Sequence, residues 1–255
     1  MPSNLSLPLS TIYAFLLVLA RISGAVVFVP IPGASASPAA ARVVLSLALT
    51  ISLVPVWPSI PTLPDPGLLA GWMMSEAAFG IAVGLLTAFL SESFVLFGQM
   101  VGLQAGYSFA SVVDPNTQAD SGVFIVLAQT FSGILFFVFG LHRQVLRILA
   151  LSLETQHPGS LLTARSVEAI VRLGSTVFTT GLKLAFPVVA LLVMVDIALA
   201  LLGRINSQIQ LLTLAFPAKM LVGLAMVSAM AVLIPRVYEE YASRLFAVMP
   251  ALVGR

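Results

Sequence analysis

Long apolar segments alternate with short polar ones along the 255-residue chain. An apolar helix needs about 20 residues to cross roughly 30 Å of hydrocarbon. Segments near this length recur throughout, although the second is short enough to be tilted, partial or buried by protein. We therefore predict an all-α, multi-helix integral membrane protein with about six to seven long hydrophobic helices, kinked by Pro and Gly. The segments are 11–31, 43–57, 68–90, 93–113, 123–141, 176–202 and 208–234.

Two prolines and one polar stretch interrupt this pattern. Pro187 and Pro217 lie inside apolar segments, where each removes a backbone hydrogen bond and kinks its helix. The longest polar stretch runs from residue 142 to 174, and His157-Pro158-Gly159 is predicted to break it into two short helical pieces. This stretch is the best candidate for a boundary between subdomains.

Composition excludes a water-soluble monomer. Only 9% of the residues are charged and 59% are hydrophobic, whereas soluble domains carry about 25% charged residues. The mean hydropathy is +1.08. A net charge of +2 without a run of Lys and Arg argues against nucleic acid as a partner. The absence of Cys excludes disulfides, thiolate nucleophiles and Cys-ligated metals.

Basic residues predict the orientation, because short loops rich in Lys and Arg stay in the cytoplasm. With the N-terminus outside and seven crossings, eight of the 12 basic residues lie inside and only Arg204 lies outside. This distribution favours a cytoplasmic C-terminus. The first ten residues carry no basic side chain and Arg21 interrupts the apolar stretch, so we expect the first helix to be retained rather than cleaved as a signal peptide.

Five ionisable residues lie within apolar segments, where a charge costs several kcal/mol unless it is paired or hydrated. Each is therefore a functional candidate. Lys183 and Asp196 are 13 residues apart on one helix, or about 20 Å along its axis, and are too distant to pair. The five residues are Arg21, Glu76, Lys183, Asp196 and Lys219.

Lys219 is a better partner for Asp196. If 176–202 and 208–234 form an antiparallel hairpin that turns near Ile205, Lys219 lies about five residues from the level of Asp196, within reach of its long side chain. We interpret the two residues as a structural ion pair in preference to a proton relay. A pair between Arg21 and Glu76 is a further candidate, although their spacing in the sequence does not support it.

Three glycines recur every four residues, which places positions without side chains on one helical face. Such a ridge lets another backbone approach closely, either within this chain or in a neighbouring subunit, and the spacing does not decide between them. Gln99 and Gln104 flank the ridge, and interhelical hydrogen bonds are the simplest partners for their amides. The ridge is Gly98, Gly102 and Gly106, and a shorter pair, Gly80 and Gly84, repeats it.

A polar hinge, residues 108–122, follows the ridge directly. Asp114-Pro115 is a strong turn signal within it. The plain interpretation is an ordinary loop outside the membrane. Its length favours a second interpretation, because a tight helical hairpin needs only a few residues, and a longer polar segment can line or plug a wet passage.

Motifs of known enzyme classes are missing from the sequence. It contains no HExxH, GxSxG, GxxxxGK[ST] or helix-opening GxGxxG pattern, and its two histidines, His142 and His157, lie in the polar stretch. We therefore predict a protein that is not an enzyme and has no catalytic residues, cofactor or metal site.

Three stretches in order carry a resemblance to a known family. They are ARISGAVVFVPIPGASASPAAAR at 20–42, GQMVGLQAGYSFASVVDP at 98–115 with GLH at 140–142, and GLKLAFPVVALLVMVDIALALLGR followed by FPAKMLVG. Over about residues 14–235 the chain resembles the FliR family of flagellar export-gate proteins, whose virulence-type secretion counterparts belong to the same superfamily. The family commonly reads Arg-x-x-Pro-Gln-x-Asn after the penultimate helix, whereas residues 204–210 lack that Pro and that Asn.

The resemblance implies a structural subunit of the flagellar type III export gate, multi-pass in the bacterial inner membrane at the basal body. Its partners would be FliP-like and FliQ-like subunits, with FlhB-like and FlhA-like proteins and unfolded protein substrates. Residues 1–175 would be a FliP-like part that holds the gate loop, and 176–255 a FliQ-like hairpin with a cytoplasmic tail. The loop that would plug the closed channel includes Gly106, Tyr107, Phe109, Val112, Val113, Asp114, Pro115, Asn116 and Gln118.

In that architecture much of the chain rises above the membrane, so several of the seven segments would be buried against neighbouring subunits instead of lipid. An alternative from another class is a secondary transporter with a midplane ion site around Asp196 and Lys219. An intramembrane enzyme would need a catalytic pair that the apolar segments do not supply.

Overall fold

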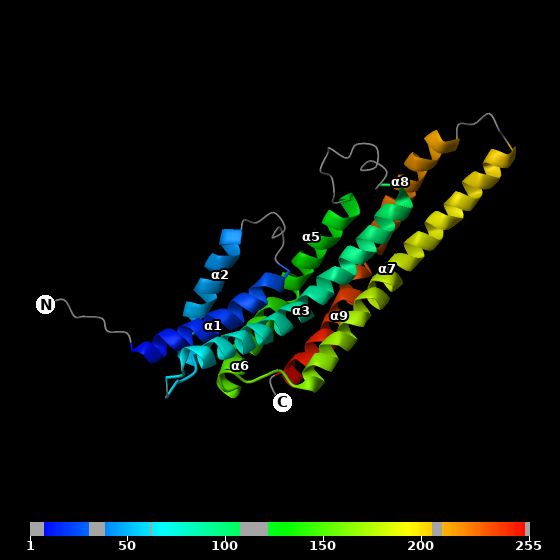
Figure 1. Cartoon of the computed structure of the whole chain (residues 1–255). Coiled ribbons are helices and arrows are strands. Elements are labelled where there is room, and N and C mark those ends of the chain that lie inside the picture. The colour runs from blue at the N-terminus through cyan, green and yellow to red at the C-terminus, as the bar shows by residue number, and fades with distance from the viewer. Residues whose placement is uncertain (1–7, 31–38, 62, 108–121, 206–210, 253–255) are drawn as a thin grey trace. The chain divides into compact units, whose positions relative to one another are not determined.

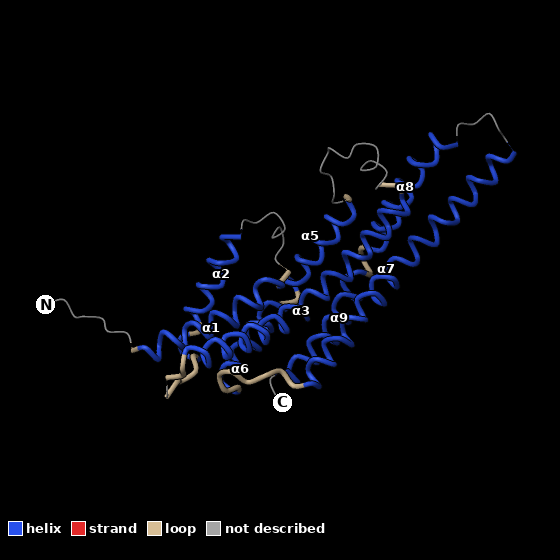
Figure 2. The backbone as a smooth tube through the Cα atoms, in the orientation of Figure 1, coloured by secondary structure: helices blue, strands red, loops and turns tan. Residues whose placement is uncertain are grey.

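A computed structural model of the chain describes residues 8–30, 39–61, 63–107, 122–205 and 211–252. In this described part every regular element is helical, and Figures 1 and 2 show the helices and the short loops between them. The all-α prediction is therefore confirmed. The elements are α1 (Leu9–Phe28), α2 (Ala39–Ser52), a 3-10 turn η1 (Val54–Val56), α3 (Pro66–Ala105), α5 (Val123–Val138), α6 (Leu141–Thr155), α7 (Ala164–Ile205), α8 (Leu211–Met230) and α9 (Ile234–Leu252).

The break expected between 68–90 and 93–113 is absent, because α3 is one helix of 40 residues. Ser91, Glu92 and Ser93 lie at the boundary between these two segments. Its serines are satisfied without leaving the helix: Ser93 Oγ donates to the Phe89 carbonyl at 2.9 Å, and Ser91 Oγ shares a hydrogen bond with Ser132 Oγ at 3.0 Å. The helix also ends at Ala105, eight residues before the expected boundary.

The lengths of the helices also correct the expected number of seven membrane crossings. Three described helices, α1, α3 and α7, are long and apolar enough to span a membrane, or up to five spans exist if α5 with α6 and α8 with α9 each count as one. The first of these pairs bends by 64° and the second by 62°. At 1.5 Å per residue, α3 and α7 are each about 60 Å long, roughly twice the thickness of the hydrocarbon core.

Two compact units divide the chain. The first comprises residues 1–88, 136–173 and 243–255, and the second comprises 89–135 and 174–242. Consequently α3, α5, α7 and α9 contribute residues to both units. The turn at His157-Pro158-Gly159 lies between α6 and α7, as the sequence predicts, but the helix after it is the start of the 42-residue α7 rather than a short piece.

Close backbone contact joins α1 and α3 in the first unit. A Cβ atom built on Gly80 would collide with the Arg21 carbonyl oxygen, and one on Gly84 would lie 2.6 Å from the Ala25 carbonyl oxygen. Because residue numbers rise together along the contact, the two helices run parallel. The Gly80 and Gly84 pair therefore serves packing within this chain.

A buried ion pair lies at this contact. Arg21 Nε donates to Glu76 Oε2 at 2.5 Å, and the two side chains are 2% and 3% exposed. Arg21 Nη1 also donates to Ser152 Oγ of α6 at 2.7 Å, and the backbone N–H of Gly159 donates to Glu76 Oε1 at 3.3 Å. These contacts tie α1, α3 and α6 together, and leaving either charge without its partner would be costly.

In the second unit, glycines of α3 and α7 again admit a neighbouring helix. A Cβ on Gly98 would lie 2.6 Å from the carbonyl oxygen of Phe124 in α5, and one on Gly181 would lie 2.9 Å from the carbonyl oxygen of Ser93. Tyr238 of α9 donates its hydroxyl to the Ser132 carbonyl at 3.0 Å. Pro187 and Pro217 both lie inside helices, α7 and α8, as predicted.

Replacing Gly80 tests the contact between α1 and α3. Gly80→Ala places a methyl group against the Arg21 backbone and should lower the free energy of unfolding by about 1–3 kcal/mol, because neither backbone can yield. The matched control is Gly71→Ala in the same helix, where a Cβ meets nothing within 4 Å. Thermal unfolding of the two variants in detergent measures the difference, and equal midpoints would contradict the packing described above.

Candidate functional site at the base of residues 106–122

The C-terminus of α3 is closed by a defined capping motif. Gly106 has a φ of +85°, a left-handed conformation that glycine adopts without strain. Its N–H donates to the Leu103 carbonyl at 3.2 Å, and the N–H of Tyr107 donates to the Gly102 carbonyl at 3.0 Å. This is the pairing of a Schellman motif, which satisfies the last carbonyls of a helix and turns the chain away. The third glycine of the ridge therefore ends the helix.

Residues at the start of α5 meet this cap. The Gly122 carbonyl accepts hydrogen bonds from the N–H groups of Ile125 and Val126, at 2.8 and 3.2 Å. The ring of Phe124 packs edge-on against the ring of Tyr107, with 4.9 Å between centroids. The contact brings together the two helix ends that flank residues 108–121. The predicted gate residues Phe109, Val112, Val113, Asp114, Pro115, Asn116 and Gln118 lie outside the described part of the chain.

The first two ridge glycines differ in what they contact. Gly98 is in close contact with the backbone of α5, so at this position the ridge packs within the chain. Gly102 is looser, because a Cβ there would lie 3.9 Å from the Phe124 side chain, an ordinary contact distance. Gln99 is exposed in this chain. A role for the Gln99 side of the ridge in a subunit interface stays a prediction.

A polar cluster lies within one helical turn of the cap. Lys219 Nζ is 2.9 Å from Asp196 Oδ1 and donates to Oδ2 at 3.0 Å, while Gln104 Nε2 donates to the same Oδ2 at 3.0 Å. The ion pair expected between Asp196 and Lys219 is therefore confirmed, as is an interhelical hydrogen bond for Gln104. The Asp196 side chain is 42% exposed and that of Lys219 is 16% exposed, so solvent can reach the pair from the aspartate side.

The pairing of α7 with α8 has a clear register. Asp196 lies opposite Lys219, and Leu192 lies one turn away beside Gly223, with 3.8 Å from a leucine methyl to a Cβ built on that glycine. Each pair adds to the same residue-number sum, as an antiparallel hairpin requires. From the sequence we expected Lys219 about five residues from the level of Asp196, because we assumed a turn near Ile205. Residues 206–210 between the helices lie outside the described part.

Helix α8 also contacts the cap itself. A Cβ on Gly106 would lie 2.9 Å from Cδ1 of Phe216, the residue before Pro217. Residues from α3, α5, α7 and α8 thus meet at one place, which we call the loop base: Gln104, Gly106, Tyr107, Phe124, Asp196, Phe216 and Lys219. No pattern in the sequence pointed to Phe216 as part of this cluster.

The other predicted charges lie elsewhere. Arg21 and Glu76 form the buried pair of the first unit, with Ser152 and Gly159 as partners that sequence reasoning missed. Lys183 is exposed on α7. Among the described residues, no group of three or more His, Asp or Glu side chains is placed to hold a metal ion.

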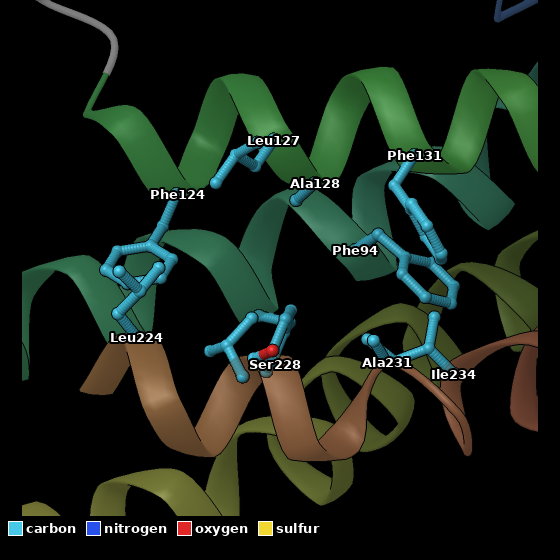
Figure 3. Close-up of a pocket in the computed structure, with 11 residues that line it drawn as sticks. Phe94, Phe124, Leu127, Ala128, Phe131, Leu224, Ser228, Ala231 and Ile234 are labelled. Carbon is cyan, nitrogen blue, oxygen red and sulfur yellow. The ribbon is translucent and has the colours of Figure 1, made fainter. Parts of the chain in front are cut away.

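An apolar cavity of about 180 Å³ lies in the second unit, between α3, α5 and the junction of α8 with α9. Figure 3 shows Phe124, Leu127, Ala128 and Phe131 along α5 on one side of it, with Leu224, Ser228, Ala231 and Ile234 facing them. The Ser228 hydroxyl is the polar group among these side chains. The contacts of the loop base suit the positioning of helices.

Comparison with known proteins gives a consistent result. The profile of bacterial export proteins, family 1, matches residues 12–245. The flagellar biosynthetic protein FliR of Escherichia coli K12 is 30% identical over 220 residues, which cover 84% of this chain and 83% of that protein. The FliR proteins of Pectobacterium carotovorum and Bacillus subtilis 168 are 28% and 27% identical, with 80% and 84% of each chain covered.

Exchanging the two charges tests the cluster. Asp196→Lys and Lys219→Asp each bring like charges together, and each should destabilise the protein by about 1 kcal/mol, since the pair is partly screened by solvent. The double exchange restores opposite charges and should recover part of the loss. Lys183→Asp, at an exposed position of α7, is the control. Thermal unfolding in detergent measures the stability of the two single variants, the double variant and the control. A double variant that is no more stable than the less stable single variant would contradict a direct interaction.

Proposed function

Because the chain belongs to the FliR family of bacterial export proteins, we propose that it is a structural subunit of the flagellar type III export gate, which forms and plugs the channel for unfolded flagellar substrates. It is a component of the flagellar export apparatus and a multi-helix protein of the inner membrane, with a structural rather than an enzymatic role. The observation that carries the proposal is the family match over residues 12–245, which includes the whole loop base.

The geometry of the loop base supports a plug that is held at both ends. The Schellman motif fixes the exit from α3, and the contact between Tyr107 and Phe124 joins that exit to the entry of α5. Gln104 links the same helix end to the Asp196 and Lys219 pair. With its ends fixed, the segment from 108 to 121 closes the channel and moves aside for substrate, while the loop base stays in place.

Exposed apolar surface supports a subunit surrounded by other proteins. Only 22% of the most apolar window of α7 is buried within this chain. We propose that FliP-like and FliQ-like subunits cover such surfaces, and that FlhB-like and FlhA-like proteins bind the assembly. Large exposed side chains of α7 include Val171, Phe178, Phe186, Met194, Leu201 and Ile205.

We also propose that residues 1–175 form a FliP-like part and residues 176–255 a FliQ-like hairpin. Support comes from the antiparallel register of α7 and α8, in which Asp196 and Lys219 lie opposite each other. Residues 204–210, which lack the Pro and the Asn of the common family pattern, connect the end of α7 to α8 in the sequence, and there contacts with a FliQ-like neighbour would differ.

A carrier with an ion site around Asp196 and Lys219 is the alternative. The two charges are paired with each other, and the similar proteins are named for flagellar biosynthesis, so the carrier has less support. Solute uptake by the purified chain alone in vesicles, lost in Asp196→Asn, would favour the carrier over the export gate.

The C-terminus is proposed to be cytoplasmic. The polar segment 142–174 and residues 234–255 carry seven of the ten arginines, and the two stretches lie on the same side if α7 and α8 form a hairpin. Because α3 is one helix instead of two, the chain crosses the membrane one time fewer than expected. The start of α1 is therefore proposed to lie on the cytoplasmic side as well. A reporter that is active only in the cytoplasm should work when fused after residue 255, and activity only of an exported reporter would contradict this orientation.

Shortening the plug tests the proposed function. Deleting residues 110–120 should raise the ion conductance of membranes that contain the assembled gate several-fold, because the helices that form the loop base remain while the closing segment is lost. Replacing the same residues by an equal length of Gly and Ser separates length from side-chain chemistry. Co-purification with the FliP-like subunit confirms assembly. Unchanged conductance in an assembled complex would overturn the gate assignment.

A further inference from the structure

The part of α7 that belongs to the second unit has an exposed apolar face. Phe178, Leu182 and Phe186 recur at four-residue spacing, and they are 69%, 51% and 66% exposed. Residues at this spacing share one face of a helix. Gly181, between them in the sequence, packs against α3, where a Cβ would lie 2.9 Å from the Ser93 carbonyl oxygen. This contact leaves the three side chains, which we call the apolar stripe, uncovered.

A cation adjoins the apolar stripe. Lys183 is exposed and directly follows Leu182, and Thr179, which is exposed as well, lies one helical turn before it. The Lys183 ammonium makes no hydrogen bond or ion pair within the described part of the chain. It differs in this from Lys219, the other lysine of the sequence, which pairs with Asp196. An unpaired charge therefore lies beside three exposed apolar side chains.

Acyl chains of lipid are a poor cover for this face. A helix needs about 20 residues to span the hydrocarbon core. Every stretch of that length between Arg172 and Arg204 contains Lys183 or Asp196. Asp196 is 42% exposed, so its pairing with Lys219 does not hide it. Because a charge that faces hydrocarbon is strongly unfavourable unless it is paired or hydrated, protein covers this face more favourably than lipid does.

We propose that the apolar stripe and Lys183 bind an apolar helix of a neighbouring subunit, and that this helix carries an Asp or Glu level with Lys183. The proposal rests on the proposed function, in which other subunits surround α7. The stripe supplies the apolar area that is buried, and the ammonium selects the partner by its charge. A wholly apolar helix would bury Lys183 without a partner, which is costly.

Charge recognition also fixes the height at which the partner helix docks. A shift of the partner by one helical turn, about 5.4 Å, takes its carboxylate out of reach of the ammonium and leaves both charges unpaired. Residues four apart on a helix are neighbours, so the Thr179 hydroxyl is placed to donate a second hydrogen bond to the same carboxylate. An apolar stripe alone would not distinguish one register of the partner from another.

Coupling of amines to carboxylates by a carbodiimide tests the proposal, because it joins only groups that are in contact. The sequence has two lysines. In the assembled gate, peptide mass spectrometry should find Lys183 joined to an Asp or Glu of another subunit, and Lys219 joined to Asp196 of its own chain. Lys183→Arg keeps the charge but should lose the link between subunits. Lys219→Arg is the matched control and should lose only the internal link.

Charge reversal gives a second measurement. Lys183→Glu brings like charges together and should lower the amount of neighbouring subunit that co-purifies by about tenfold, the effect of losing a charged hydrogen bond. Lys183→Arg should co-purify as the wild type does. Arg236→Glu, at an exposed position of α9, is the control for the change in net charge and should also behave as the wild type. Thermal unfolding of the isolated chain should be the same in all of these variants.

The outcomes separate this proposal from the proposed function. A wild-type chain that assembles with no FliP-like or FliQ-like subunit would overturn both. Equal assembly of Lys183→Glu and the wild type would overturn the charge recognition alone. The same holds if Lys219 couples to Asp196 while Lys183 couples to no other subunit. A photoreactive residue at position 182 that captures lipid instead of protein in the assembled gate would also overturn it.

Discussion

Polar groups in apolar surroundings must be satisfied by other groups of the protein, and this constraint determines how α3 is held. At one end of the helix, Glu76 meets Arg21, which in turn reaches Ser152. Near the other end, Gln104 meets Asp196 and Lys219. In a chain with only 9% charged residues, each of these contacts fixes a helix position that apolar packing alone would leave free to slide.

Close backbone approach is the second requirement for these contacts. Gly80 lets α1 come near enough for Arg21 to reach Glu76, and Gly98 lets α5 come near enough for Phe124 to meet Tyr107. A side chain at either glycine would separate the helices and lengthen the polar contacts. Packing and polar satisfaction therefore depend on each other along the same helix, and the loop base follows from both.

The sequence predicted those features that depend on local patterns or on one hairpin. Apolar segments of membrane length, the prolines inside α7 and α8, and the Asp196 and Lys219 pair follow from periodicity and spacing. The break expected between 68–90 and 93–113 was wrong, because Ser91 and Ser93 find partners within the protein and α3 continues through them. Arg21 and Glu76 are 55 residues apart in the sequence, and Ser152 is further still, so no local rule connects them. Which helix a glycine faces is likewise a property of tertiary structure.

The central proposal is that the loop base stays in place while the channel opens. Because the chain has no cysteine, Tyr107→Cys and Phe124→Cys create a unique pair of thiols, which a short bismaleimide can join in the assembled gate. Export of flagellar protein, measured before and after cross-linking, tests the claim most directly. The account predicts that export continues in the cross-linked complex. A complex that assembles but stops exporting only when the two thiols are joined would contradict it.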